Sequence, residues 1–222
     1  MRILELQQIL TKREKNDRDL GLFKSITFWA VVELILFSLL HYSYILIFGM
    51  GANYFGMLFI MPVVMTAVYC FMGADPLAQF DIMTPALPAA LVFVKLCCFF
   101  EGCCYGIQSP YGIYFSVRGL FEAPVQLIES FNAFLIFLFL IVYKKFAKKG
   151  TMYPAYVFLY SLTRFFSEFV RHEKNVLWVF KSYHFLCFAG IVLGVVAFIL
   201  VSVHREKLES VLYRFSYKGK QR

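Results

Sequence analysis

The chain is poor in charged residues and lacks cationic side chains over a long stretch. Charged residues make up 16% of its 222 residues, below the roughly 25% that is usual in soluble domains. Lysine and arginine are missing from the whole stretch between Lys24 and Lys95. These absences exclude an ordinary soluble fold, and the high hydrophobicity excludes intrinsic disorder. No GxxxxGK(S/T), GxSxG or HExxH motif occurs, which argues against soluble nucleotide or protease chemistry.

Hydrophobic residues make up 60% of the chain and aromatic residues 19%, which indicates an integral membrane protein. Because unpaired backbone groups cannot face hydrocarbon and no alternating strand pattern occurs, we predict an all-α fold, a polytopic bundle of about six transmembrane helices. The six segments are residues 25–48, 54–73, 81–100, 125–143, 152–170 and 184–203. Gly190 and Gly194 form a GxxxG in the last segment, which favours an intramolecular packing contact.

The positive charge is distributed unevenly between the two sides of this predicted bundle. The net charge of +8 comes mainly from the chain ends and the loop 144–149, whereas the opposite side carries few cations. The positive-inside rule therefore places both termini in the cytoplasm and the loops 101–124 and 171–183 outside. We expect a cytoplasmic N-terminal segment (1–24), a six-span membrane domain (25–203) with the external loop 101–124, and a basic cytoplasmic tail (204–222). The tail is expected either to lie on an anionic leaflet or to be solvated.

Ionisable side chains inside the predicted spans are the first candidates for a functional site, because burying them in a membrane costs at least about 2.5 to 3.5 kcal/mol each. Lys95 lies near the outer end of the third span, while Arg164, Glu168 and Arg171 share one face of the fifth. They predict a cationic pocket for an anionic lipid headgroup. Further polar residues expected to line it are Glu101, Gln126 and Glu129. The alternatives are an internal Arg164–Glu168 salt bridge and snorkelling of Lys95 and Arg171 to the interface.

Four cysteines gather at the outer boundary of the third span, on either side of the sequence FFEG: Cys97, Cys98, Cys103 and Cys104. If the cysteines have a chemical role, they would hold a metal or form a disulfide relay. If their role is structural, their small polarisable side chains beside Gly102 and Gly106 allow close packing. Vicinal pairs do not match the CxxC spacings of zinc sites or thioredoxin-like motifs, so we predict no metal and no cofactor.

Several motifs of the second half of the chain resemble those of the prolipoprotein diacylglyceryl transferases, which are bacterial inner-membrane enzymes. They are EGCCYG (101–106), YGIYF (111–115), PVQLIES (124–130) and YSLTRFFSEFVR (160–171), in the order of that family. In the last motif Tyr160, Arg164, Phe165, Glu168 and Arg171 fall on the family's pattern. The resemblance runs from about Asp81 to the sixth span. It implies a multi-pass protein of the bacterial cytoplasmic membrane.

The resemblance also implies a reaction and a set of site residues. Family enzymes move the diacylglyceryl group of phosphatidylglycerol onto the lipobox cysteine thiol of a preprolipoprotein. The resemblance makes Arg164, Glu168 and Lys95 the catalytic candidates, since cationic donors stabilise the departing phosphate. The implied substrate-binding residues are Arg171, Tyr160, Gln126, Glu129, Glu101, Gly102 and Gly106. The implied partners are phosphatidylglycerol or another anionic phospholipid, a lipobox-containing preprolipoprotein and the membrane; we expect no nucleic acid and a monomer.

The chain departs from the family pattern at two places, which indicates a divergent or shortened member. The family's signature Arg and two Asn align with Lys95, Cys98 and Glu101. The family's HGG motif falls near residues 55–57, where its histidine has no counterpart. His172 and His184 are candidates to replace this base, although a solvated His172 and an interfacial His184 are simpler interpretations.

These departures leave two other functions open. One is a catalytically silent protein that binds anionic phospholipid or lipoprotein precursors. The other is a membrane thiol oxidoreductase that uses the four clustered cysteines.

Overall fold

The computed structural model describes residues 54–71, 75–116, 118–172 and 180–220. The expected N-terminal segment 1–24 and the predicted span 25–48 lie outside these residues. The chain divides into two compact units, Met1–Met65 and Thr66–Arg222, and the second unit carries the candidate site. Its elements follow α2 (Tyr54–Phe71), which crosses the boundary between the units. They are α3 (Pro76–Met83), α4 (Ala86–Phe100), β1 (Gln108–Phe115), β2 (Leu120–Glu122), α5 (Val125–Tyr143), α6 (Met152–Val170) and α7 (Ser182–Lys220).

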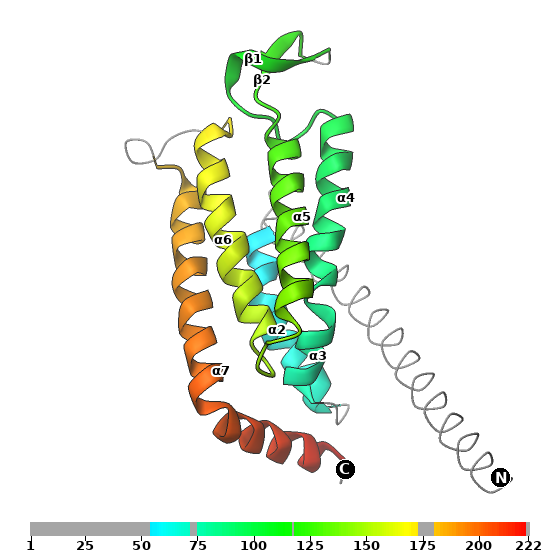
Figure 1. The fold of residues 1–222 in the computed structure, drawn as a ribbon, viewed down its shortest axis with the longest axis vertical. Helices are drawn as coiled ribbons and strands as arrows, with labels where there is room; N and C mark the ends of the chain where they lie inside the picture. Colours follow the sequence, from blue (N-terminus) through cyan, green and yellow to red (C-terminus); the bar gives the residue numbers. More distant parts are fainter. Residues whose placement is uncertain (1–53, 72–74, 117, 173–179, 221–222) are drawn as a thin grey trace, which may run out of the picture. The chain divides into compact units, whose positions relative to one another are not determined.

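Four helices of the second unit lie side by side in chain order (Figure 1). α5 contacts α4 and α6, and α6 contacts α7. The antiparallel strands β1 and β2 connect α4 to α5, at the end of the bundle where α6 also ends and α7 begins (Figure 1). We refer to this as the hairpin end. Side chains from the last turn of one helix and the first turn of the next therefore meet there.

The protein is mostly helical, as predicted, and its apolar helices are those of a membrane protein. In the described part of the chain, three helical stretches are long and apolar enough to cross a membrane: Pro76–Phe100, Val125–Tyr143 and Ser182–Arg205. α6 has the same length as α5, but buries Ser161, Arg164, Ser167 and Glu168 and exposes Phe166. Its polar side therefore faces protein, where ionisable residues of membrane proteins are usually found.

The predicted span 81–100 is part of a longer helical stretch that breaks at Thr84 and Pro85. A proline has no backbone N–H to donate and restricts the residue before it, so a new helix begins here. The carboxylate of Asp81 accepts hydrogen bonds from the backbone N–H groups of Gly150 and Met152, at 2.5 and 3.2 Å. These bonds fix α3 to the start of α6, where backbone donors have no partner within the helix.

The hairpin was not predicted, because the segment 101–124 reads as an external loop. The strands pair Tyr114 with Phe121 and Phe115 with Leu120. Gly119, with φ +67°, supplies the left-handed residue of the turn. An exposed two-stranded ribbon has little sequence periodicity to reveal it, since neither face of β1 is consistently buried.

α6 and α7 approach each other closely at Gly194. A Cβ atom at this position would lie 2.8 Å from the backbone nitrogen of Phe158, so only glycine fits. This confirms the intramolecular contact expected from the GxxxG of the last span. At His204 the backbone leaves helical geometry, and residues 205–220 continue as a helix in a new direction (Figure 1).

Candidate active site

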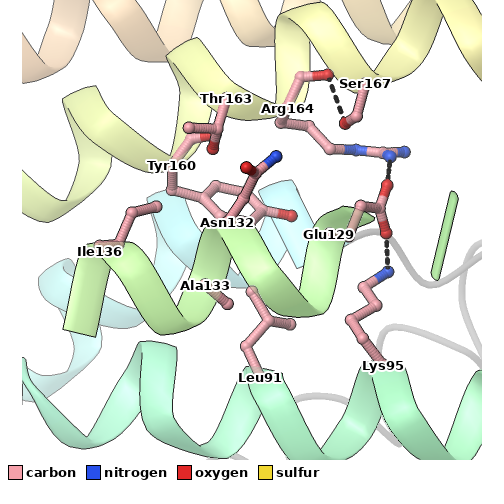
Figure 2. Close-up of a pocket in the computed structure, with 10 residues that line it drawn as sticks. All are labelled: Leu91, Lys95, Glu129, Asn132, Ala133, Ile136, Tyr160, Thr163, Arg164 and Ser167. Atoms are coloured by element: carbon pink, nitrogen blue, oxygen red, sulfur yellow. Dashed lines mark hydrogen bonds and ion pairs between the residues drawn. The ribbon is translucent and has the colours of Figure 1, made fainter. Parts of the chain in front are cut away.

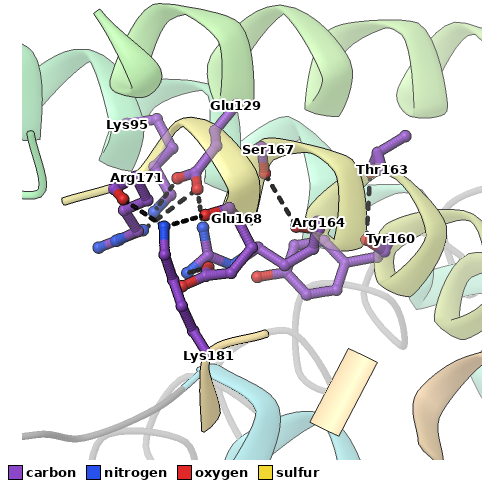
Figure 3. Close-up of polar contacts among 9 residues, drawn as sticks. All are labelled: Lys95, Glu129, Tyr160, Thr163, Arg164, Ser167, Glu168, Arg171 and Lys181. Carbon is purple, nitrogen blue, oxygen red and sulfur yellow. Dashed lines mark hydrogen bonds and ion pairs between the residues drawn. The ribbon is translucent and has the colours of Figure 1, made fainter. Parts of the chain in front are cut away.

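Three cationic side chains converge on one buried carboxylate, that of Glu129 on α5 (Figure 3). Lys95 from α4 places its Nζ 2.6 Å from Oε2 of Glu129. Arg164 from α6 and Arg171, the residue after α6, both place Nη1 on Oε1, the latter at 3.1 Å. The carboxylate thus joins three segments at the hairpin end.

Arg164 is shared between two carboxylates. Its Nη1 binds Glu129, and its Nη2 lies 2.9 Å from Oε2 of Glu168 on the next turn of α6. Glu168 is completely buried and Arg164 nearly so. The internal Arg164–Glu168 salt bridge considered from the sequence is therefore present. It holds the guanidinium in a fixed orientation, because each of its two ends has a separate acceptor.

Lys181, just before α7, adds a further buried positive charge. Its Nζ donates to the backbone carbonyl of Glu168 at 2.6 Å and to that of Arg171 (Figure 3). Lys181 was predicted only as a loop cation, although its position at the start of an apolar helix was a clue. Among the described residues, four cationic side chains thus lie with two carboxylates. The cationic residues are Lys95, Arg164, Arg171 and Lys181.

A pocket opens beside this cluster and combines charged, polar and apolar walls (Figure 2). Its charged residues are Lys95, Glu129 and Arg164, and its apolar side chains come from α4 and α5. The remaining lining residues are Leu91, Asn132, Ala133, Ile136, Tyr160, Thr163 and Ser167. The lining thus places cationic and apolar side chains next to each other, the two kinds of surface that an amphiphile contacts.

Asn132, Thr163 and Ser167 were not identified from the sequence. The hydroxyl groups of Thr163 and Ser167 donate to backbone carbonyls of α6, which is how such residues usually satisfy themselves in an apolar helix. Asn132 lies three positions after Glu129, on the same side of α5. An amide inside an otherwise apolar span was the signal that could have found it.

Other predicted site residues lie in or against the loop that follows α4. Gln126 is fully buried, and its Nε2 donates to the carbonyl of Cys103 at 2.5 Å. Gly102 is buried, and its carbonyl accepts a hydrogen bond from Arg118. Glu101 ends α4 with an exposed side chain. These residues shape the loop beside the cluster, and Glu101 is not among the residues that line the pocket.

Gly106 is a point of close backbone approach. It forms an isolated antiparallel bridge with Arg171. A Cβ atom here would lie 2.5 Å from the carbonyl oxygen of Ala123 and 2.7 Å from Cγ2 of Val125. A glycine at this position therefore allows the loop, the start of α5 and the residue after α6 to meet.

His172 and His184, the two candidates to replace the family's histidine, contact groups outside the cluster around Glu129. The Nδ1 atom of His184 accepts a hydrogen bond from the backbone N–H of Lys181 at 3.0 Å, so the neutral ring carries its proton on Nε2. Its ring packs against Phe165, Phe169 and Phe180. This arrangement fits an anchoring residue and leaves no ring nitrogen free to accept a proton.

His172 is exposed and stacks on Tyr105, with ring centroids 5.4 Å apart. Arg171 has an extended backbone, and successive side chains of an extended segment point to opposite sides. Since the side chain of Arg171 reaches Glu129, that of His172 points away from the cluster.

Three of the four loop cysteines come together. The sulfur atoms of Cys98, Cys103 and Cys104 all lie within 4.8 Å of one another, whereas Cys97 is exposed. Burial, and then a hydrogen bond with Cys98, raise the pKa of Cys103 to about 12. The thiol is therefore protonated at neutral pH, unlike the thiolate that a disulfide relay requires.

Comparison with known proteins agrees with the motifs. The family described as "Prolipoprotein diacylglyceryl transferase" matches residues 4–200. The chain belongs to this family. Membership of the prolipoprotein diacylglyceryl transferase family, predicted from the motifs around Glu101 and Arg164, is thus confirmed.

Several relatives are bacterial proteins named for this activity. The phosphatidylglycerol–prolipoprotein diacylglyceryl transferase 2 of Clostridium perfringens is 36% identical over 103 residues, which cover 43% of this chain and 40% of the relative. The transferase of Clostridium tetani is 29% identical over 133 residues, covering 56% and 53%. That of Campylobacter lari is 32% identical over 111 residues, covering 48% and 40%. The chain thus spans about half the length, or less, of these relatives.

Proposed function

We propose that this family member transfers the diacylglyceryl group of phosphatidylglycerol to the lipobox cysteine thiol of a preprolipoprotein. The relatives' names describe this activity. The observation that carries the proposal is the convergence of Lys95, Arg164 and Arg171 on Glu129 beside a partly apolar pocket. The anionic phosphate of a phospholipid complements the three cationic side chains there.

The cations around Glu129 suit the chemistry of diacylglyceryl transfer. The acceptor thiol gives up its proton to water, its sulfur attacks the glyceryl carbon, the carbon–oxygen bond to the phosphate breaks, and glycerol phosphate leaves with the electron pair. Donors fixed around the departing phosphate stabilise its growing charge, and each is worth about 3 to 4 kcal/mol in other enzymes. Arg164 offers a planar guanidinium with five N–H donors, Lys95 a point charge, and Glu168 orients Arg164.

The remaining predicted residues have supporting roles in this proposal. Tyr160 lines the pocket and contacts the glycerol portion. Gln126, Gly102 and Gly106 position the loop beside the cluster. Glu101, exposed at the end of α4, contacts the acceptor peptide.

The proposed setting is the bacterial cytoplasmic membrane, crossed several times, with residues 1–24 and 204–222 in the cytoplasm and the hairpin end outside. The charge asymmetry of the sequence supports this orientation. Cys97 is exposed at the hairpin end and is suited to test it. A membrane-impermeant maleimide should label Cys97 in intact spheroplasts; labelling only after lysis would reverse the orientation.

The direct test is an assay with purified protein, phosphatidylglycerol vesicles and a lipobox peptide, read by mass spectrometry of the thioether product. Replacing one fixed donor of this kind costs about 100- to 1000-fold in rate in other enzymes, so we expect such a loss in Arg164→Lys. Lys145→Ala, exposed at the opposite end of the bundle, should keep the wild-type rate. No product under conditions in which a relative is active would overturn the proposal.

The second candidate function is binding of phosphatidylglycerol without turnover. The positions of His172 and His184 favour it. Neither His172 nor His184 offers a basic nitrogen to the cluster around Glu129. A silent protein would retain phosphatidylglycerol through purification, and lose it in Arg164→Lys, without forming any thioether.

A further inference from the structure

The turn after α4 gathers three thiols by means of unusual backbone geometry. Cys98 lies in the last turn of α4, and the backbone N–H of Cys103 donates to its carbonyl at 3.0 Å. Gly102 has φ +69° and Cys104 has φ +57°. A residue with a side chain rarely adopts this left-handed region, which costs it about 1 kcal/mol or more. This strained turn brings Cys103 and Cys104 back to the end of the helix.

Neighbouring elements hold the turn in place. Arg118 of the hairpin donates to the carbonyl of Gly102 at 2.5 Å, and its Nε and Nη2 bind the buried carboxylate of Glu122. Gln126, at the start of α5, donates to the carbonyl of Cys103 at 2.5 Å. Both carbonyls flanking the first thiol of the turn are thus fixed from outside. The three sulfur atoms are ordered before any ligand arrives.

We propose that Cys98, Cys103 and Cys104 bind a zinc ion through three thiolates and leave its fourth position open. Zinc prefers tetrahedral sulfur ligands at about 2.3 Å, which places the sulfur atoms about 3.8 Å apart. The observed separations, all within 4.8 Å, need to contract by no more than about 1 Å. Among the described residues, no fourth histidine, cysteine or carboxylate belongs to the group. Three protein ligands with an open position are typical of catalytic zinc sites.

The open position has a use in the proposed transfer, and this part of the inference rests on that function. An acceptor cysteine that binds zinc loses its proton to water, because a coordinating thiol is deprotonated. The zinc-bound sulfur then attacks the glyceryl carbon, and the carbon–oxygen bond breaks with its electron pair going to glycerol phosphate. The product thioether is a weak neutral ligand that water displaces. Zinc would thus perform the proton removal for which the cluster offers no histidine.

The position of the thiols relative to the cation cluster fits this sequence of events. Cys98 lies one helical turn beyond Lys95 on α4, about 4.5 Å along the axis. On α5, Gln126 lies one turn before Glu129 and binds the carbonyl of Cys103. Cys98 and Lys95 therefore occupy consecutive turns of α4, and Gln126 and Glu129 occupy consecutive turns of α5.

Metal binding is tested first, without any substrate. The purified full-length protein is titrated with Zn²⁺ and, as a spectroscopic probe, with Cd²⁺, whose bonds to thiolates absorb in the ultraviolet. We expect about one ion per chain, and loss of binding in C98S, C103S and C104S. C97S is the matched control, because Cys97 is adjacent but exposed and outside the group, and it should bind as wild type does. Absence of binding, equal loss in C97S, or retention of Cu⁺ in place of Zn²⁺ would overturn the site.

A measurement on the wild-type protein tests the site without relying on the folding of the cysteine variants. Zinc should protect Cys98, Cys103 and Cys104 from alkylation, and leave Cys97 reactive, as read by peptide mass spectrometry. Equal alkylation of all four with and without zinc would overturn the site.

The role in transfer is tested last. Zinc-loaded protein should form the thioether at least about 100-fold faster than chelator-treated protein, the scale of one lost catalytic group. Equal rates would overturn the thiol-activating role. No transfer by either form, with one bound zinc, would overturn the proposed transferase function while the metal site stands.

Discussion

Removing the charge of Glu129 is the most direct test of the role of the ion cluster. Glu129→Gln keeps the shape of the side chain but leaves Lys95 and Arg171 without the buried carboxylate that they share. Breaking a buried ion pair costs about 3 to 5 kcal/mol. Because Arg164 keeps Glu168 as a partner, we expect the lower end, about 3 kcal/mol. For a chain of this size that lowers the midpoint of thermal unfolding by roughly 6 to 12 °C.

The assay is thermal unfolding in detergent, followed by circular dichroism, with Asp75→Asn as the matched control. Asp75 pairs with Lys149, but both side chains are more than a third exposed, at 46% and 37%. Such a pair contributes about 0 to 1 kcal/mol, and asparagine retains the helix-capping role of Asp75. The variant Glu129→Gln should also gain more stability from added phosphatidylglycerol than wild type, since it lacks one negative charge beside the cations. Equal midpoints for the two variants would refute the view that Glu129 organises the site.

Three further predictions concern the surroundings of the cluster. Gly106→Ala should lose about 1 to 3 kcal/mol and make the hairpin sensitive to proteases, because its Cβ would meet the carbonyl of Ala123 at 2.5 Å; an intact hairpin would contradict this. In metal-free protein at about pH 8, Cys103 should react with an alkylating agent on the order of 50-fold more slowly than free cysteine, since its pKa is raised to about 12. Its rate should rise with pH, whereas rapid reaction at neutral pH would restore the thiol oxidoreductase hypothesis. Lys181→Met should speed hydrogen exchange at the end of α6, because two carbonyls there lose their donor; unchanged exchange would show that the lysine does not hold this end.

Much of the helical framework follows from the sequence. The predicted spans 125–143 and 152–170 coincide with α5 and α6, because both are bounded by charged, glycine or proline residues that end a helix. The break at Thr84 and Pro85 was missed, since a proline within an apolar run also occurs inside helices such as α2, at Pro62.

The composition of the site was easier to predict than its geometry. Ionisable residues inside apolar segments are conspicuous, so Lys95, Arg164 and Glu168 were found individually. The central position of Glu129 was not predictable, because its contacts with Arg164 join helices 35 positions apart and depend on how those helices pack. The cluster of three cysteine thiols could not be predicted from the spacing of the cysteines in the sequence. It forms because two residues with positive φ, Gly102 and Cys104, bring the thiols together.

The central claim is that the cations around Glu129 hold a phospholipid phosphate. A structure of the protein with phosphatidylglycerol measures this directly. We expect phosphate density within about 3 Å of Lys95 Nζ or of the Arg164 guanidinium, the distance of a charge-assisted hydrogen bond. A lipid phosphate bound elsewhere, with Lys95, Arg164 and Arg171 still on Glu129, would contradict it.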